Sequence, residues 1–438
     1  MATEQTVIRR KRDTEGRYLK SIAVQAKWER QRLPGLMAES ATGLVVTDVT
    51  GKQYLDFSQS IVILGHSHPD IAKAVAKCVP DYLVGGTPGW SMMEPRVKLA
   101  EELKANLSGR LRVGKVAFCS SGAESCDYAL GLARSYTRRE IIISFAGAYH
   151  GFTGATLAVS SIEPHLAAHR GSSRTGNVVA PFPGDPDFAD ERRYERYCID
   201  KFKELLQTVT TADEVAGMIF EPIEVNAGVR IPSLSFWREI FKTCHEHGIL
   251  TIADEVFTGL GRTGKFLGID NFGVEPDIVC FGKGVGGTLP LGVIVGRNEI
   301  LDGHIKPNCN SASAGNPICC VAGYESLRVI KRDQLMKNSA EVGRYFKERL
   351  SELMDRHEIV ADVRGLGLIL GMEIGPRKEK VVASKRAERV MELGFEKGLL
   401  MSRVGIYDNV LRISPPMVVT KGQVDIFVDS MDEALAAL

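Results

Sequence analysis

The sequence predicts an α/β protein with a large, mostly parallel sheet and a second, smaller α+β domain. Through the middle of the chain, short apolar runs alternate with amphipathic helical stretches, the pattern of a parallel sheet covered on both faces. After about residue 315 the pattern changes to long amphipathic helices with short strands between them. A chain of 438 residues is long enough for two or three domains.

The individual elements follow from these runs. KVAFC and EIIISF are typical of buried strands, and the pattern predicts strands at Lys115–Cys119, Glu140–Phe145, Ala216–Phe220, Ile249–Ala253, Ile278–Phe281 and Gly292–Val295. Helices are expected at Glu124–Tyr136 and Phe236–His247, and a polar, proline-rich stretch over 161–192 interrupts the alternation. Further on, helices are expected at about 318–356 (with a break), 383–397 and 421–437, with strands near 367–374 and 409–413.

We therefore expect a large domain over residues 70–315 and a small one over 316–438, to which residues 1–69 contribute an N-terminal arm and segment. The arm is basic, with nine Lys/Arg in residues 1–34, including the run Arg9-Arg10-Lys11-Arg12. Its acidic residues, such as Asp13, argue against a transit peptide, so a solvated or partner-contacting arm is expected.

Composition excludes several classes of function. The net charge of +1 provides no global field for nucleic acid or anionic lipid, and no apolar run approaches the ~20 residues of a membrane helix. The nine cysteines are scattered, without CxxC pairs or metal-ligand spacing, which favours reduced thiols in the cytoplasm and no metal site. Glycine is abundant, 44 residues, as expected where the backbone approaches a phosphorylated ligand closely.

Two glycine-rich segments match G-x-G-x-x-G, at 259–264 and 282–287. A dinucleotide-binding fingerprint must open a helix whose N-terminus holds the pyrophosphate, and neither segment is followed by a helical pattern. The first segment also resembles a P-loop, but Phe266 stands where Ser or Thr must hold magnesium. We therefore do not expect these segments to bind a nucleotide.

Ligands of parallel sheets bind beyond the carboxyl ends of the strands, so the residues just after each strand matter most. Ser120-Ser121-Gly122-Ala123 joins a strand to a helix and would free backbone N–H groups for a phosphate, although a simple helix cap by Ser120 or Ser121 gives the same pattern. Asp254 ends an apolar strand, where it can pair with a buried cation or simply cap a turn.

Two further segments supply a reactive amine and an aromatic ring. Lys283 follows five residues of buried character between two glycines, which is unusual for a surface lysine. Desolvation there would lower its pKa and favour Schiff-base chemistry. Tyr149 offers a ring for stacking, and Gly151 allows close approach, whereas His150 is as consistent with a structural role as with a functional one.

Together these segments predict a binding site for pyridoxal 5′-phosphate. Such a site needs a phosphate-binding loop, an acid beside the ring nitrogen, a lysine that reacts with an aldehyde, and a ring for stacking. The chain here resembles the class III aminotransferases of the fold type I pyridoxal-phosphate superfamily. The matching segments keep the family's order across most of the chain: LDF…GHSHP (55–69), SSGAESCDYALGLAR (120–134), AYHGFTGATL (148–157), FEPIEVNAG (220–228), ADEVFTGLGRTGKF (253–266), PDIVCFGKGVGGTLPLG (276–292), AGNP (314–317) and VLRISPPM (410–417).

The resemblance implies roles for matching residues. Lys283 would form the Schiff base and shuttle the proton, and Asp254 would keep the pyridine nitrogen protonated. Arg412 would bind a substrate carboxylate. The other implied cofactor neighbours are Ser121, Gly122 and Ala123 at the phosphate, Tyr149 and Val256 on the two ring faces, and His150 and Glu221 close by. The family's active site is shared between two subunits, so a homodimer is implied.

Three departures from the family pattern bear on specificity. Phe257 replaces the family's Gln beside the cofactor's ring oxygen. Asn226 replaces a glutamate that often accompanies ω-amino acid substrates, and it would lie at the substrate. Ala312 replaces the partner subunit's phosphate-binding threonine, a role that Ser311 or Ser313 would take over.

The function expected is transfer of an amino group from an amino acid or amine donor to a 2-oxo acid. A racemase, an epimerase or a decarboxylating enzyme of the same fold would use the same lysine, acid and phosphate seat, and it is the first alternative. A non-enzymatic or nucleotide-binding protein that uses the glycine loops is the second, and it predicts no bound chromophore.

Overall fold

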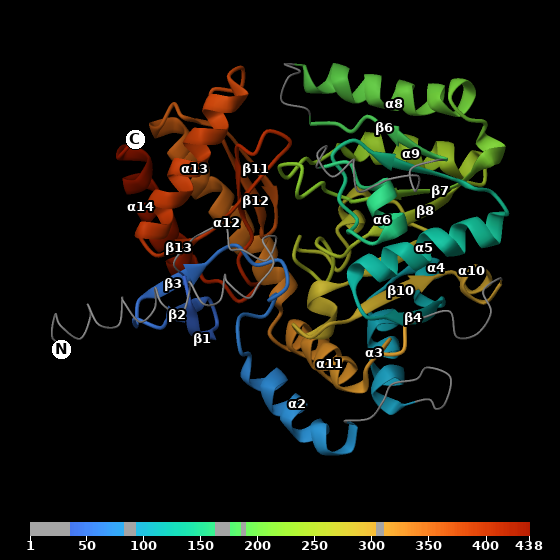
Figure 1. The fold of residues 1–438 in the computed structure, drawn as a ribbon, viewed down its shortest axis with the longest axis horizontal. Helices are drawn as coiled ribbons and strands as arrows, with labels where there is room; N and C mark the ends of the chain where they lie inside the picture. The colour runs from blue at the N-terminus through green and yellow to red at the C-terminus, as the bar shows by residue number, and fades with distance from the viewer. Residues whose placement is uncertain (1–35, 83–92, 163–175, 185–189, 304–310) are drawn as a thin grey trace.

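The structure is a computed structural model that describes residues 36–82, 93–162, 176–184, 190–303 and 311–438 (Figure 1). The expected basic arm at Arg9–Arg12 lies outside the described residues, as do parts of the stretch 161–192. None of the helices in these ranges is long and apolar enough to cross a membrane.

Seven strands form the central sheet, in the order β4-β10-β9-β8-β7-β5-β6. Four neighbouring pairs are parallel, and the two pairs that contain β10 are antiparallel. The expected mostly parallel sheet is therefore confirmed. The strands are β4 (Lys115–Cys119), β5 (Ile141–Phe145), β6 (Asn177–Ala180), β7 (Val215–Phe220), β8 (Leu250–Asp254), β9 (Ile278–Phe281) and β10 (Gly292–Gly296).

Helices cover both faces of this sheet because its strands are apolar on both sides. On one face, Leu130 of α5 (Gly122–Thr137) belongs to a core that includes Ile252 and Ile294. On the other face, Trp237 of α9 (Leu234–Glu246) packs its ring 4.5 Å from that of Phe220. The remaining elements of this part are α3 (Glu94–Ala105), α4 (Gly109–Arg112), α6 (Gly154–Val159), α8 (Glu191–Thr208), α10 (Asn298–Asp302) and the 3-10 turns η4 (Ala212–Glu214), η5 (Ile269–Phe272) and η6 (Lys283–Gly286).

The strand directions bring six carboxyl ends to one edge of the sheet. Strands β5, β6, β7, β8 and β9 run parallel, and β4 shares their direction because it is antiparallel to β10, as β9 is. Five of these strands, β4, β5, β7, β8 and β9, carry residues expected at the site at or just after their carboxyl ends. Their meeting at one edge is a consequence of topology alone.

Two smaller sheets lie beside the large one (Figure 1). One is antiparallel, in the order β11-β12-β15-β14, with bounds β11 (Val360–Leu366), β12 (Ile369–Ile374), β14 (Ser402–Val404) and β15 (Val410–Ile413). The other joins the N-terminal strands β1 (Ala38–Thr42), β2 (Val45–Asp48) and β3 (Gln53–Asp56) to the late strand β13 (Leu399–Leu400). Helices α2 (Pro69–Tyr82), α11 (Pro317–Arg332), α12 (Leu335–Arg356), α13 (Lys380–Glu396) and α14 (Lys421–Ala436) complete the chain.

The strand β13 pairs in parallel with β3, so that Leu399 lies opposite Leu55 and Leu400 opposite Asp56. Figure 1 shows the blue N-terminal strands against the red C-terminal elements. This pairing accords with an N-terminal segment that contributes to the small domain, while the domain boundaries near residues 70 and 315 stay a prediction.

The expected strands and helices are present, with ends shifted by a few residues. Strand β6 lies inside the polar, proline-rich stretch over 161–192 and was not expected. It has four residues and pairs only with β5 at the edge of the sheet, and so short a strand leaves little periodicity in the sequence. Helix α8 was not expected either. Its three-residue start Glu191-Arg-Arg follows the N-cap Asp190, and its many charges mask the buried stripe formed by Cys198, Phe202 and Leu206.

Candidate active site

Lys283 begins the turn η6, directly after strand β9. Its backbone has a φ of +47°, which costs energy for a residue with a side chain. Close packing holds this conformation, because a Cβ on Gly282 would come within 2.7 Å of the Gly122 Cα atom. Burial lowers the pKa of the Lys283 amine to about 8, an effect that Asp254 opposes and the charge of Arg412 reinforces.

Asp254 ends strand β8, and its carboxylate is held at both oxygens. The ring Nδ1 of His150 lies 2.8 Å from Oδ2, and the backbone N–H of Val256 donates to Oδ1 at 3.0 Å. The side chains of His150 and Asp254 are 0% and 5% exposed. A buried carboxylate in this setting is fixed in direction and favours a cationic partner.

The start of helix α5 lies against this acid. Ser121 is the N-cap, since its hydroxyl accepts a hydrogen bond from the backbone N–H of Glu124. A Cβ on Gly122 would lie 2.7 Å from Cγ1 of Val256, so only glycine fits at that position. The first backbone N–H groups of a long helix, beside small side chains, suit an anion such as a phosphate.

Tyr149 and Glu221 are joined through the backbone. The Tyr149 N–H donates to a Glu221 carboxylate oxygen at 2.8 Å, and the Val225 N–H donates to the other at 3.3 Å. Burial raises the pKa of the Glu221 carboxyl to about 8, although the neighbouring His150 opposes this. Glu221 thus braces the segment that carries the Tyr149 ring.

Arg412 reaches the site from strand β15 of the antiparallel small sheet. Its Nη1 donates to the amide oxygen of Asn226 at 2.9 Å, and its Nη2 donates to the hydroxyl of Ser402 at 3.1 Å and to the carbonyl of Ser58 at 3.3 Å. These contacts orient the guanidinium plane, the requirement for two-armed binding of a carboxylate.

Asn226 lies in a loop whose two ends are joined both by backbone hydrogen bonds and by an ion pair. Glu224 and Arg230 exchange backbone hydrogen bonds of 3.1 Å, and their side chains form an ion pair of 2.8 Å that is at most 3% exposed. The Asn226 carbonyl also accepts from the Gly405 N–H at 2.9 Å. The loop therefore ties the large sheet to the segment beside Arg412.

Most of the expected residues line two adjoining spaces. A cavity of about 160 Å³ is lined by Gly122, Ala123, Tyr149, His150, Glu221, Asn226, Asp254, Val256 and Lys283, together with Gly151 and Phe257. A cleft of about 690 Å³ adds Arg412 and shares Tyr149, Asn226, Phe257 and Lys283 with the cavity.

Three expected residues lie outside both spaces. Ser121 is exposed at its helix cap, and Ser313 is exposed in a loop. Ser311 lies 2.6 Å from Ser120, hydroxyl to hydroxyl, near the start of α5. Within one chain, therefore, neither Ser311 nor Ser313 lines the described cavity.

Several residues that support Arg412 or the segment after it were not expected from the sequence. Ser58 and Ser402, which contact Arg412, gave no signal because isolated serines are common. Arg262 is fully buried and donates to the carbonyl of Pro415 at 2.9 Å, which braces the segment after Arg412. Burial lowers its pKa to about 9, and its place inside a glycine-rich loop was the one available clue.

One group in the described residues has metal-ligand spacing. One ligand atom each of Cys126, His150 and Asp254 lie within 4.8 Å of one another. The neighbouring Cys280 and burial raise the pKa of the Cys126 thiol. His150 Nδ1 lies 2.8 Å from Oδ2 of Asp254, so the His150 ring supports this carboxylate.

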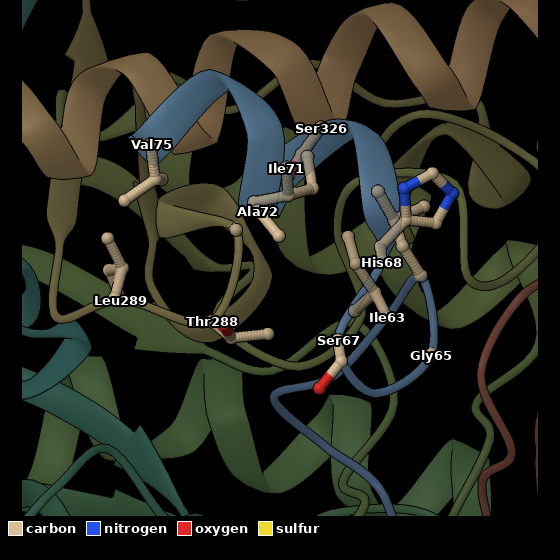
Figure 2. A pocket seen from close by; sticks show the side chains of 12 residues that line it. Ile63, Gly65, Ser67, His68, Ile71, Ala72, Val75, Thr288, Leu289 and Ser326 are labelled. Atoms are coloured by element: carbon tan, nitrogen blue, oxygen red, sulfur yellow. The ribbon is translucent and has the colours of Figure 1, made fainter. Parts of the chain in front are cut away.

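A separate, mostly apolar pocket of about 180 Å³ lies between α2 and the turn after η6 (Figure 2). Ile63, Ile71, Val75 and Leu289 line it, and His68 at its rim is the one titratable side chain among its lining residues. Ile63 also packs against Gly284, where a Cβ would come within 2.6 Å of its Cδ1. The pocket therefore lies behind the lysine turn and contains none of the site residues.

The comparisons with known proteins agree with this arrangement. The family pattern of the class III aminotransferases matches residues 24–435. The chain is 33% identical to an acetylornithine aminotransferase of Methanosarcina acetivorans, with 96% of this chain and 98% of the relative covered. It is 32% identical to an isoleucine 2-epimerase of Lentilactobacillus buchneri, with 92% and 90% covered. A transaminase structure from the marine bacterium Virgibacillus superposes with a TM-score of 0.88 at 28% identity, with 97% and 98% covered.

These features define a fold type I pyridoxal-phosphate enzyme. The chain belongs to the class III aminotransferase family. The expected fold class, cofactor and aminotransferase activity are thereby confirmed, with amino donors and 2-oxo acids as the substrate classes.

The residues present fit pyridoxal phosphate. The carboxylate of Asp254, the buried amine of Lys283 and the glycine-lined start of helix α5 border one cavity. Gly151 also admits no side chain, because its Cβ would lie 2.6 Å from that of Ala123. His150 Nε2 is buried beside this cavity and has no hydrogen-bond partner among the described residues, so it is available to a ligand bound there.

Proposed function

We propose that Lys283 attaches the cofactor and carries the proton to and from the amine-bearing carbon of the substrate. The observation that supports this role is a buried amine of lowered pKa that borders both the cavity and the cleft. A lysine with a pKa of about 8 is neutral often enough to act as nucleophile and base near physiological pH.

The other residues have supporting roles in this proposal. Asp254, fixed by His150, holds a proton on the cofactor's ring nitrogen, and Tyr149 and Val256 bracket the ring. The N–H groups of Gly122 and Ala123 receive the phosphate, and Arg412 takes the substrate carboxylate. When bound, pyridoxal phosphate withdraws electrons from the carbon that loses its proton.

We further propose that the enzyme is a homodimer in the cytoplasm. Two large side chains near the cleft are exposed in one chain, Ile61 by 44% and Phe152 by 54%, which supports cover by a second subunit. A partner subunit would also give Ser311 or Ser313 a phosphate to bind. The eight described cysteines are buried and free, which suits a reducing compartment.

Racemisation or epimerisation of an amino acid is the second candidate. The relative named isoleucine 2-epimerase matches this chain about as well as the acetylornithine aminotransferase does. Both reactions need the same proton transfer at Lys283, so the lysine, the acid and the phosphate seat do not separate them.

The absorbance spectrum of the purified enzyme separates the two candidates. Single amino donors are added without any oxo acid. We expect the yellow cofactor band to bleach and stay bleached, because a half-reaction leaves the amino group on the cofactor. A band that persists while the added amino acid loses optical purity would establish the second candidate. Lys283→Ala should abolish turnover, and turnover within tenfold of the parent enzyme would contradict the role of Lys283.

A further inference from the structure

We propose that Arg364, on strand β11 of the antiparallel small sheet, is a positioning residue for the active site. It holds the tip of the loop 224–230, and this loop carries Asn226 to the guanidinium of Arg412. Arg364 lines neither the described cavity nor the described cleft. The inference adds a distant residue to the proposed function and rests on it only in that Arg412 receives the substrate carboxylate.

The two ends of this loop are fixed to the large domain. Glu224 and Arg230 form the buried ion pair described above, and Arg230 also donates to the carbonyl of Ala146, after strand β5, at 2.7 Å. The tip, residues 226–229, is held differently, by groups of the antiparallel small sheet and of the turn that precedes β15. The position of the tip therefore depends on the small domain.

Arg364 makes a direct hydrogen bond to this tip. Its Nε donates to the carbonyl oxygen of Gly228 at 2.8 Å. Gly228 has a φ of +105°, and a Cβ on it would lie 3.2 Å from Nη2 of Arg364 and 3.2 Å from Cγ2 of Val410. A glycine is therefore needed for the loop to approach β11 and β15 this closely.

Two acids hold the Arg364 guanidinium in this direction. Its Nη1 donates to Oε2 of Glu373 at 2.7 Å and to Oδ2 of Asp362 at 2.5 Å. The Glu373 side chain is 2% exposed, and Asp362 lies opposite it in the pairing of β11 with β12. Charge-assisted hydrogen bonds at one end of a planar guanidinium fix the direction of its other N–H groups, so the Nε–H is aimed at the loop.

The backbone of the tip is strained. Val229 has a φ of +58°, which is unfavourable for a β-branched residue. Its side chain packs on Gly371 of β12, where a Cβ would come within 3.2 Å of the Val229 Cβ, and Gly371 lies opposite Arg412 in the pairing of β12 with β15. A strained conformation persists only where the surroundings enforce it, and here the small sheet supplies those surroundings.

The tip in turn holds Asn226 against Arg412. The Asn226 amide oxygen accepts from Nη1 of Arg412 at 2.9 Å, and its backbone carbonyl accepts from the Gly405 N–H at 2.9 Å. Without the Arg364 contact the tip would be free to move, and Asn226 would no longer direct the guanidinium. Two-armed binding of a carboxylate depends on that direction, so the loss should be confined to donors that carry a carboxylate.

The first experiment compares two arginines of one charged cluster. Arg377 pairs with the same two acids as Arg364, with Glu373 at 3.1 Å and with Asp362 at 3.7 Å, and these ion pairs do not extend to the loop. The donors are 2-aminobutyrate and 2-aminobutane, which has a methyl group in place of the carboxylate. The initial rate of bleaching is measured with the cofactor-loaded enzyme.

Arg364→Gln should raise KM for 2-aminobutyrate by about fivefold or more, with kcat and the KM for 2-aminobutane within about twofold of the parent enzyme. Arg377→Gln should leave all of these within about twofold. Equal effects of the two variants, or equal losses with both donors, would overturn the inference and leave the proposed function intact. If the parent enzyme bleaches with neither these donors nor any other amino donor, the proposed function fails, and the exchange measurement below still tests the inference.

A double-mutant cycle tests whether Arg364 acts through Asn226. Asn226→Ala removes the amide that directs the guanidinium and should raise KM for 2-aminobutyrate by itself. In this background Arg364→Gln should add less than about twofold, because the contact that it positions is already lost. If the two separate effects simply multiply, Arg364 acts elsewhere and the inference is overturned.

Hydrogen exchange in the cofactor-free full chain follows the loop without turnover. The N–H groups of Val229 and Arg230 are hydrogen-bonded to carbonyls of the same loop at 3.1 Å, so their exchange reports how often the loop opens. Exchange in the peptide over 224–230 should be about tenfold faster in Arg364→Gln than in the parent chain, and unchanged in Arg377→Gln. Equal protection in the parent chain and a folded Arg364→Gln would overturn the inference.

Arg364→Lys covers the case in which Arg364→Gln does not fold. Lysine keeps a positive charge beside Glu373 and Asp362, but its single ammonium group cannot serve these acids and the Gly228 carbonyl as the arginine fork does. It should therefore show faster exchange over 224–230 and a KM for 2-aminobutyrate about threefold or more above that of the parent enzyme. Parent values for both quantities would overturn the inference.

Discussion

His150 and Asp254 form a buried pair, with Nδ1 of the imidazole 2.8 Å from Oδ2 of the carboxylate. His150 lies in the segment after strand β5 and Asp254 is the last residue of strand β8, so the pair forms only when these parallel strands lie in the same sheet. The second carboxylate oxygen receives the Val256 N–H. The direction in which the acid presents its charge is thus set by the fold.

Replacing that acid should slow catalysis more than it weakens cofactor binding. In Asp254→Asn the amide cannot hold a proton on the ring nitrogen, so stabilisation is lost where charge develops in the transition state. We expect kcat to fall by ~10²-fold or more, with a smaller change in cofactor affinity. Rapid-mixing kinetics and cofactor titration measure the two quantities. Unchanged catalysis would assign the role to another residue.

Arg412→Ala should affect only substrates that carry a carboxylate. Loss of a two-armed, charge-assisted contact should raise KM for such donors by at least tenfold, whereas KM for a simple amine should change little. Arg412→Lys is the matched control, since it keeps the charge without the fork, and it should recover only part of the loss. Equal losses with both kinds of donor would remove Arg412 from this role.

The uptake of pyridoxal phosphate by the cofactor-free chain should depend on pH through Lys283. Burial lowers the pKa of this amine from its ordinary 10.5 to about 8. The neutral amine is the nucleophile, so the rate should rise with pH and level off above about 8. Stopped-flow absorbance measures it. A rate that still rises steeply above pH 9 would mean that the amine has its ordinary pKa.

Breaking the Glu224–Arg230 ion pair should destabilise the protein strongly. Glu224→Gln leaves the Arg230 charge buried without its partner, which costs about 3–5 kcal/mol in such pairs. Glu204→Gln is the matched control, because its pair with Lys201 is exposed and such pairs contribute about 0.5 kcal/mol or less. Urea unfolding compares the two, and similar losses would show that burial does not make the difference.

Much of the fold and site could be predicted because both depend on local patterns. Apolar runs such as Ile278–Phe281 predicted strands, and the rule that parallel strands end at one edge placed Asp254 and Lys283 together. Helix α8 could not be predicted in the same way, because its charges hide a narrow buried stripe.

The contacts between distant segments could not be predicted either. Ser58 and Ser402 both contact Arg412 although 344 positions separate them in the sequence. The sequence around each serine has no pattern that predicts this contact. Phe257 was recognisable as a departure from a family pattern, but its closeness to the cationic groups of Lys283 and Arg412 depends on the position of strand β15. Such relationships arise from packing and have no local signature.

The parallel pairing of β3 with β13 has a consequence for synthesis of the chain. Residues 53–56 leave the ribosome long before their partner strand at 399–400 is made. Until then one edge of the N-terminal sheet is open and able to pair with the wrong strand. The N-terminal sheet is therefore completed only after residues 399–400 are made, and a chain that stops before residue 399 would carry an unpaired edge that chaperones and proteases can recognise.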